Sequence, residues 1–200
     1  PVFRHTDLPN RRKKILYFAS FDQDNRKDAV ITASDISFSK TSTTFRVYFA
    51  KREPFQVKIK TLGRASVEDI LPAIYLAFHF KIDQNALLKS LTRIKPIQGR
   101  MQPLRHIASG AMLINDTYNA NPDSILSTLE YAKLYKGKKI MILSPLIELG
   151  KDSSTIHKNL GKKIGMVLDF LYVTNKNYFD DLQEGISEVN SSCDLKQITT

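Results

Sequence analysis

Apolar and polar residues alternate along the first third of the chain, as they do in strands with one buried and one solvated face. The alternation is clearest over 44–49 and 55–59, and the polar segment 51–54 between them is typical of a turn. Ser34-Asp35 is a second turn signal. This region therefore predicts a small antiparallel sheet. We expect its strands at 14–18, 29–32, 36–39, 44–49 and 55–59.

The period changes to that of a helix after Gly63. The residues that share one helical face there are Val67, Ile70, Leu71, Ile74 and Phe78. Pro72 lies within this segment, and it is accommodated if Asp69 caps the helix, because a proline in the first turn loses no hydrogen bond. A second helix is expected to begin at Asp83 and to end before Pro96, with Ile94 facing inward.

Strands and helices alternate after a Pro- and Gly-containing junction at 96–103. Asn121 is expected to cap a helix that has Pro122 at its first position and ends at Gly137. This order implies right-handed β-α-β units on a mostly parallel sheet. The fold class is therefore α/β, with one domain over 1–99 and a second over 100–200. The expected strands are 111–115, 139–143, 168–173 and 196–199, and the further helices start near 153 and 178.

The charge of the chain is strongly positive, with a formal net charge of +10 and a pI near 9.6. A nucleic-acid partner is one explanation, and a generally basic, solvated surface is the one we favour. The lysines and arginines are scattered apart from a cluster at 11–14, and no zinc-finger or RNA-reader signature is present, so we expect no nucleic-acid partner. No apolar run approaches the ~20 residues of a membrane span. Cys193 is the single cysteine, which fits a reducing, cytoplasmic compartment.

A polar loop at 116–121 is the best candidate site, because it follows an expected strand and precedes a helix N-terminus. Asp116 offers a carboxylate to sugar hydroxyls, and the helix N-terminus suits an anion. The residues alone leave a second interpretation open, in which Asn121 is only a helix cap and Asp116 binds nearby backbone amides.

Residues 115–124 read N-D-T-Y-N-A-N-P-D-S, and this segment resembles the D-[ST]-Y-N-A-N-P-D-S stretch that opens the C-terminal domain of Mur ligases. The segment P-I-Q-G-R-M at 96–101 is similar to the P-x-x-G-R-[ML] junction of the same family. Glu148-Leu149-Gly150 with His157 resembles its E-L-G…H segment, and 62–77 resembles its G-x-H-N-x-x-N-x-L-A-A helix. The spacing of His157 is consistent with a surface position, with capping or packing as its alternative role.

The resemblance implies that the second domain is Rossmann-like and that the first is the end of a central ATPase domain. It also implies roles for particular residues. Asp116 would hold the ribose of ATP, Arg100 would reach the phosphates across the domain junction, and Asp69 would accept from the adenine amine. The residues expected to shape the cleft and position the incoming dipeptide are Tyr118, Asn119 and Asn121.

The family reaction implied is ATP-dependent amide formation in peptidoglycan synthesis. A carboxylate of a UDP-N-acetylmuramoyl-peptide is phosphorylated by ATP, and the amine of D-alanyl-D-alanine then attacks the acyl phosphate. The resemblance therefore implies ATP and Mg²⁺ as cofactors, these two substrates, and a monomeric enzyme.

The sequence departs from the family pattern at Ala65, Ser66 and Asp69, which stand where the family has His, Asn and Asn, and at Pro145, which stands where it has Asp. A non-catalytic, degenerate binding module of the same family is therefore one alternative, and a basic nucleic-acid-binding protein is another. A phosphate-binding loop needs a glycine five residues before a Gly-Lys pair, and none of the three Gly-Lys pairs has one. We therefore expect this loop and the magnesium ligands upstream of the chain, leave the catalytic residues unassigned, and expect the chain alone to be inactive.

Overall fold

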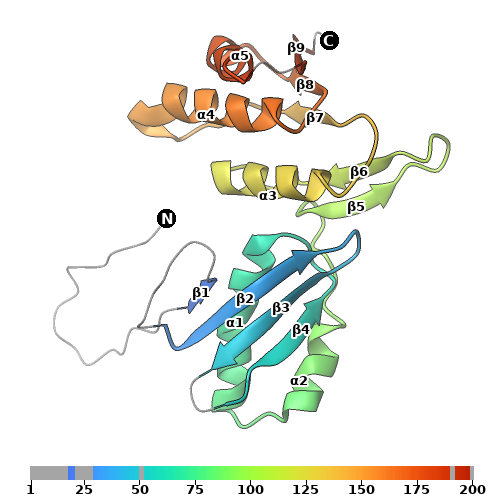
Figure 1. The fold of residues 1–200 in the computed structure, drawn as a ribbon, viewed down its shortest axis with the longest axis vertical. Coiled ribbons are helices and arrows are strands. Elements are labelled where there is room, and N and C mark those ends of the chain that lie inside the picture. The colour runs from blue at the N-terminus through green and yellow to red at the C-terminus, as the bar shows by residue number, and fades with distance from the viewer. Residues whose placement is uncertain (1–17, 21–28, 50–51, 190–191, 199–200) are drawn as a thin grey trace.

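The computed structural model describes residues 18–20, 29–49, 52–189 and 192–198, and its strands form three separate sheets (Figure 1). The strand expected at 14–18 lies outside these residues except for Phe18, and so does the basic cluster at 11–14. None of the helices in the described residues combines the length and the apolar character that a bilayer crossing needs.

The first sheet has the order β1-β2-β3-β4. Its strands are β1 (Phe18–Ser20), β2 (Ile31–Phe38), β3 (Thr43–Phe49) and β4 (Phe55–Ile59). β1 runs parallel to β2, and the other pairs are antiparallel. The prediction of two strands separated by Ser34-Asp35 is wrong. β2 is continuous, and a register shift between Ser34 and Ser37 absorbs the left-handed Asp35. A bulge of this kind keeps both halves of a strand paired to the same neighbour.

Two helices pack on this sheet, α1 (Arg64–His79) and α2 (Gln84–Leu91). Asp83 caps α2 as expected, accepting from the backbone N–H of Ala86 at 3.0 Å. The cap predicted at Asp69 is wrong, because α1 begins after Gly63 and Pro72 lies in its interior. Val67 and Ile70, which precede Pro72, are buried in the core, and this burial outweighs the hydrogen bond that proline cannot make. The prediction for Ile94 is also wrong, since it lies beyond the end of α2 and is exposed.

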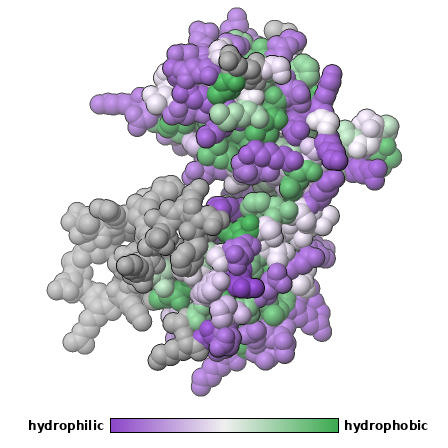
Figure 2. Space-filling view, in the orientation of Figure 1, coloured by the Kyte–Doolittle hydropathy of each residue, from purple (hydrophilic) through white to green (hydrophobic). Residues whose placement is uncertain are grey.

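A two-stranded ribbon follows the junction, formed by β5 (Gln102–Arg105) and β6 (Met112–Asn115). We expected the strand at 111–115 to belong to the parallel sheet, but β6 pairs antiparallel with β5 instead. The ribbon projects from the body of the molecule (Figure 1). Apolar side chains are exposed toward its outer end (Figure 2), among them Ile107, which is 96% exposed, and Leu113.

The remaining elements form the parallel sheet and its helices. They are α3 (Pro122–Ala132), β7 (Ile140–Leu143), a short 3-10 helix (Gly150–Asp152), α4 (Ser153–Gly165), β8 (Phe170–Val173), α5 (Phe179–Ser187) and β9 (Asp194–Gln197). The three strands are parallel in the order β7-β8-β9, which confirms the α/β class. α3 ends at Ala132 rather than at Gly137, so Lys133 and Lys136 lie after the helix.

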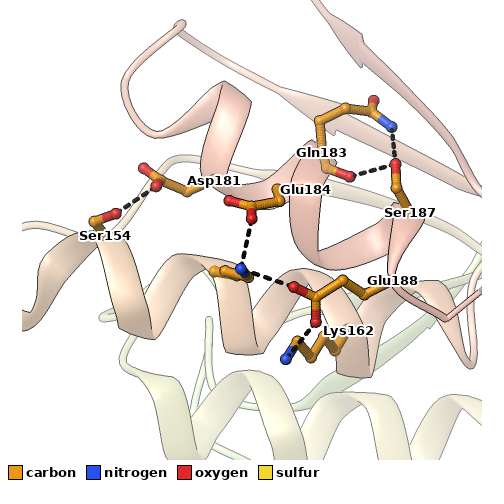
Figure 3. Close-up of polar contacts among 8 residues, drawn as sticks. Ser154, Lys162, Asp181, Gln183, Glu184, Ser187 and Glu188 are labelled. Carbon is orange, nitrogen blue, oxygen red and sulfur yellow. Dashed lines mark hydrogen bonds and ion pairs between the residues drawn. The ribbon is translucent and has the colours of Figure 1, made fainter.

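α4 and α5 lie so close that their backbones touch. A Cβ atom on Gly161 would approach the carbonyl oxygen of Leu182 to 2.3 Å, and one on Gly185 would approach that of Lys158 to 2.0 Å. Salt bridges bind the same two helices on their solvent side (Figure 3). Lys158 pairs with both Glu184 and Glu188, at 2.5 and 2.7 Å. The backbone contact therefore fixes the spacing of the helices, and the exposed ion pairs add little to it.

Two large cores hold the described residues together. One lies between the first sheet and α1–α2, and includes Phe45, Val57 and Leu71. The other lies between the parallel sheet and its helices, and includes Leu171, Leu182 and Ile186. A third, small cluster joins the two halves of the molecule. Its buried members are Leu62, Met101 and Tyr131.

Candidate functional site

Asp116 lies directly after β6, and its carboxylate binds two other segments of the chain. Oδ1 accepts from the backbone N–H of Met101 at 3.0 Å, and Oδ2 accepts from the hydroxyl of Thr128 on α3 at 3.0 Å. We call these three residues, Met101, Asp116 and Thr128, the junction clasp. The Asp116 side chain is only half-buried. A carboxylate has about four acceptor sites, so the clasp leaves acceptor capacity for a ligand hydroxyl.

The junction itself is strained at the point that the clasp holds. Met101 is buried, and its backbone is left-handed, with φ of 44°. This conformation is uncommon for residues other than glycine, so it persists only where surrounding contacts fix it. The Asp116 carboxylate supplies one such contact. Leu62 and Tyr131, which share a cluster with the Met101 side chain, supply others.

Gly99, two residues before Met101, contacts the loop that follows Asp116. The backbone N–H of Tyr118 donates to the carbonyl of Gly99 at 2.9 Å. Gly99 has φ of 75°, and a Cβ atom there would lie 3.3 Å from both the backbone nitrogen and the Cβ of Tyr118. Glycine therefore permits both the turn and the close approach of the loop.

Arg100 and Tyr118 stack beside the clasp. The guanidinium carbon of Arg100 lies 4.6 Å from the centre of the Tyr118 ring, a distance typical of a cation–π contact. Arg100 is exposed, and 68% of Tyr118 is exposed. The structure thus brings three expected site residues together, Arg100, Asp116 and Tyr118, and directs a guanidinium and a carboxylate to the same solvent-accessible loop.

Asn121 caps α3 in the way that the sequence predicts. Its side-chain oxygen accepts from the backbone N–H of Ser124 at 2.8 Å, and the Ser124 hydroxyl accepts from the backbone N–H of Asn121 at 3.0 Å. This reciprocal pair is a capping box. The cap uses the oxygen of the Asn121 amide and not its NH₂ group. Asn119 is exposed in the same loop.

Asp69 does not join this group in the structure. It lies exposed in α1, on the other half of the molecule, and no hydrogen bond or ion pair among the described residues connects it to Arg100 or Asp116. The Ser66 hydroxyl is also engaged, because it donates to the carbonyl of Leu62, just before the start of α1, at 2.9 Å. The role of Asp69 toward adenine stays a prediction.

His157 is fully buried, so the expectation of a surface position is wrong and its packing role is confirmed. Nε2 accepts from the backbone N–H of Leu146 at 3.0 Å, and Nδ1 lies 2.7 Å from the carbonyl of Ser153, to which it donates. The ring stacks on Tyr178 with centroids 4.1 Å apart. Nε2 therefore attaches the loop after β7 to α4, Nδ1 is used within α4, and neither nitrogen is left for a ligand.

A contact between the two halves of the molecule was not expected from the sequence. Tyr131 of α3 donates from its hydroxyl to the carbonyl of Lys40, in the turn between β2 and β3, at 2.7 Å. Its oxygen is also 2.8 Å from the hydroxyl of Tyr135. Burial, and to a smaller extent the hydrogen bond with Tyr135, raise the pKa of Tyr131 well above the ordinary tyrosine value.

Sequence reasoning also missed Thr128, the one side chain of the clasp that lies on a helix. A weak signal was present, since this threonine follows Ser124 by one helical turn and lies beside the buried Leu129. No group of three or more potential metal-ligating side chains occurs within the described residues.

Comparisons with known proteins identify the family. The family described as "Mur ligase, glutamate ligase domain" matches residues 99–199. A UDP-N-acetylmuramoyl-tripeptide–D-alanyl-D-alanine ligase of Haemophilus influenzae is 28% identical over 143 residues, which are 72% of this chain and 30% of that protein. The ligase of the same name from Bacillus subtilis is 31% identical over 132 residues, which are 65% of this chain and 28% of that protein.

Solved structures agree at the level of the fold. A crystal structure of MurF from Acinetobacter baumannii has a TM-score of 0.70 at 22% identity, covering 84% of this chain and 36% of that chain. MurF ligase from Thermotoga maritima, solved in complex with ADP, has a TM-score of 0.66 at 19% identity, covering 91% and 44%. The chain thus spans about a third of the curated relatives that it matches. On the family match over residues 99–199, the chain belongs to the Mur ligase family.

Proposed function

We propose that this chain is part of an ATP-dependent amide ligase that adds D-alanyl-D-alanine to a UDP-N-acetylmuramoyl-peptide in peptidoglycan synthesis. The observation that carries the proposal is the grouping of Arg100, Asp116 and Tyr118 around the junction between the two halves of the molecule. The names of the relatives from Haemophilus influenzae and Bacillus subtilis support these substrates. Because the reactants are ATP and a UDP-linked peptide, the proposal places the complete enzyme in the cytoplasm.

In this proposal, Asp116 accepts a hydrogen bond from a ribose hydroxyl of ATP through the acceptor capacity that the clasp leaves free. Arg100 turns from the Tyr118 ring to the phosphates, where its planar donors match the oxyanions. Tyr118, Asn119 and Asn121 border the space in which the dipeptide amine approaches. We also propose a domain boundary between residues 99 and 100, which the two separate cores support.

The proposed reaction has two steps, phosphorylation of the carboxylate and formation of the amide. An oxygen of the substrate carboxylate attacks the γ-phosphorus of ATP, which gives an acyl phosphate and ADP. The amine of D-alanyl-D-alanine then attacks the acyl carbon, phosphate leaves, and one proton is released. Such catalysis rests mainly on positioning and on neutralising phosphate charge. Mg²⁺ bound with ATP would supply part of this charge neutralisation.

The experiment that tests the proposal uses the complete protein, with amide product and ADP both measured. Arg100→Ala is expected to reduce turnover by at least about 100-fold, as loss of a group that neutralises transition-state charge does. Asp116→Ala is expected to reduce turnover at limiting ATP by a similar factor, because ribose binding is lost. Circular dichroism should show an unchanged fold, since both side chains are exposed or half-buried. The 200-residue chain alone is expected to release no ADP.

Arg105→Ala is the matched control for Arg100→Ala, because Arg105 is an exposed arginine at the far end of β5. It should keep the turnover of the unchanged protein within twofold. The proposal fails if the complete protein forms no amide from these substrates. The site assignment fails if both site variants keep full turnover.

A second candidate function is a non-catalytic nucleotide-binding module of the same family. The observation that favours it is at the start of α1, where Ala65 replaces one polar residue of the family pattern and the Ser66 hydroxyl donates to the carbonyl of Leu62. This candidate predicts that the complete protein binds ADP and forms no amide. Calorimetry with ADP, run beside the turnover assay, separates the two.

A further inference from the structure

Thr128 is the residue from which a further role follows, and this inference rests on the proposed function of Asp116. Its hydroxyl lies 3.0 Å from Asp116 Oδ2 and also 3.0 Å from the sulfur of Met101. A hydroxyl has one proton to donate, and an ionised carboxylate is a far stronger acceptor than a thioether. The hydrogen bond therefore goes to Asp116.

The two hydrogen bonds of Asp116 fix its carboxylate in the plane and orientation that the structure shows. Met101 holds one oxygen through the backbone of the junction, and Thr128 holds the other from the seventh position of α3. The helix is anchored at its start by the Asn121 capping box and at its end by the contact of Tyr131 with Lys40. Thr128 thus ties the carboxylate to a rigid element, whereas the loop after β6 alone would leave it free to rotate.

Arg100 lies beside the clasp and has contacts of its own. This arginine directly precedes Met101, and its guanidinium rests on Tyr118, two residues after Asp116. The Tyr118 backbone also bonds to Gly99, so these contacts hold the arginine without Thr128. Loosening the clasp at Thr128 is therefore expected to displace mainly the carboxylate.

We propose that Thr128 is a positioning residue of the nucleotide site, which orients the Asp116 carboxylate for the ribose of ATP without touching the nucleotide itself. A displacement of a positioned group by about 1 Å is enough to cost a large factor in binding or rate. The effect should appear in the affinity for nucleotide more than in the chemical step, because ribose contacts are made in both the bound state and the transition state.

The test compares Thr128→Val with Thr128→Ser in the complete protein. Thr128→Val keeps the shape of the side chain and removes its hydroxyl. We expect it to raise the KM for ATP and the Kd for ADP about fivefold or more, as the loss of a hydrogen bond to a charged group predicts, while kcat changes less than about twofold. Thr128→Ser restores the hydroxyl and should return both constants to within twofold of the original values.

Thr117→Val is the matched control. Thr117 lies next to Asp116 in the same loop, and its hydroxyl donates to Asn115 rather than to Asp116. The same change of chemistry there should leave KM and Kd unchanged within twofold. Thr128→Ala serves as a second replacement, so that a packing fault caused by valine is not mistaken for loss of the hydroxyl. Calorimetry with ADP on protein whose fold circular dichroism confirms gives the constants for each variant.

The outcomes separate this inference from the function on which it rests. If Asp116→Ala weakens ADP binding and neither Thr128→Val nor Thr128→Ala does, the positioning role is wrong and the nucleotide site stands. If Thr128→Ser binds ADP as weakly as Thr128→Val, the hydroxyl is not the cause and the role is again wrong. If the unchanged protein binds no ADP, the inference falls together with the proposed function.

Discussion

The loops after β6 and β7 are built on the same plan and differ in what they leave exposed. In each, one hydrogen bond joins a backbone N–H to a side chain of another segment. After β6 the loop supplies the acceptor, Asp116, and Met101 supplies the N–H. After β7 the loop supplies the N–H of Leu146, and His157 of α4 is the acceptor. His157 is fully buried, both of its ring nitrogens are used, and one ring face is covered by Tyr178. Asp116 is half-buried and retains acceptor capacity.

The two hydrogen-bonded side chains differ in what remains for a ligand. His157 has no hydrogen-bonding capacity left, whereas Asp116 retains some. A buried group whose hydrogen-bonding capacity is satisfied contributes to folding and has nothing left for a partner. A half-exposed group held at a fixed angle is suited to a ligand. We therefore expect changes at His157 to affect mainly stability and changes at Asp116 to affect mainly nucleotide binding.

His157→Ala is the change with the largest expected effect on stability. It leaves the buried N–H of Leu146 without an acceptor, removes the stack on Tyr178 and opens a cavity. Together these should lower the free energy of unfolding by about 3 kcal/mol, measured by urea denaturation. His106→Ala, at the exposed tip of the β5–β6 ribbon, is the control and should change it by less than about 0.5 kcal/mol. Weaker ADP binding by a folded His157→Ala variant would contradict the distinction between His157 and Asp116.

Tyr178 tests the same anchor from its other side. This residue is left-handed, with φ of 57°, and stacks on His157. Tyr178→Ala loses the stack and keeps the backbone strain, so it should cost about 2 kcal/mol. Tyr178→Gly loses the same stack but adopts this conformation readily, and it should be about 0.5–1 kcal/mol less destabilising than alanine. Equal losses in urea denaturation would show that the backbone conformation stores no strain.

Asp116→Asn should have a smaller effect on stability, of about 1 kcal/mol. The amide oxygen can accept from Met101 while the NH₂ group donates to the Thr128 hydroxyl, so both contacts remain but lose the strength of a charged acceptor. ADP binding, measured by calorimetry, should weaken by about tenfold or more. A variant that lost about 3 kcal/mol of stability with unchanged ADP binding would place Asp116 in the same class as His157.

Tyr131→Phe should cause the smallest loss of unfolding free energy at neutral pH. It should also change how the unfolding free energy depends on pH at high pH. Because the pKa of Tyr131 is raised in the folded protein, its contribution to stability is complete below the ordinary tyrosine pKa of about 10 and is lost as the pH rises toward the folded value. Unfolding free energies should therefore fall more steeply above about pH 10 in the unchanged protein than in Tyr131→Phe. Parallel curves for the two proteins would contradict the raised pKa.

Local signals in the sequence predicted much of the fold. Alternation located β3 and β4, and the caps at Asp83 and Asn121 located the starts of α2 and α3. These features depend on residues a few positions apart, so a single sequence carries them. β2 was divided wrongly because Ser34-Asp35 has the composition of a turn. Only its partner strand β3 shows that the chain continues through a bulge there.

The candidate site residues came from the sequence, and the contacts that hold them came only from the structure; their roles toward a ligand stay predictions. Asp116, Arg100 and Tyr118 came from the motif, and the structure places them together. The contact between Asp116 and Thr128 depends on how β6 and α3 pack, and no local pattern records it. The burial of His157 also depends on distant chain, since Tyr178 and Leu146 enclose it from separate segments.

The contact of α4 with α5 has a consequence for recognising other sequences that share this arrangement. At Gly161 and Gly185 the obstacle to any side chain is backbone of the facing helix, which cannot rotate aside as a side chain could. A larger residue at either position must therefore push the two helices apart. An aligned sequence that carries a larger residue at either position is expected to have a wider helix pair, whatever its overall identity. Glycine at both positions therefore indicates that a distant homologue shares the close packing of these two helices.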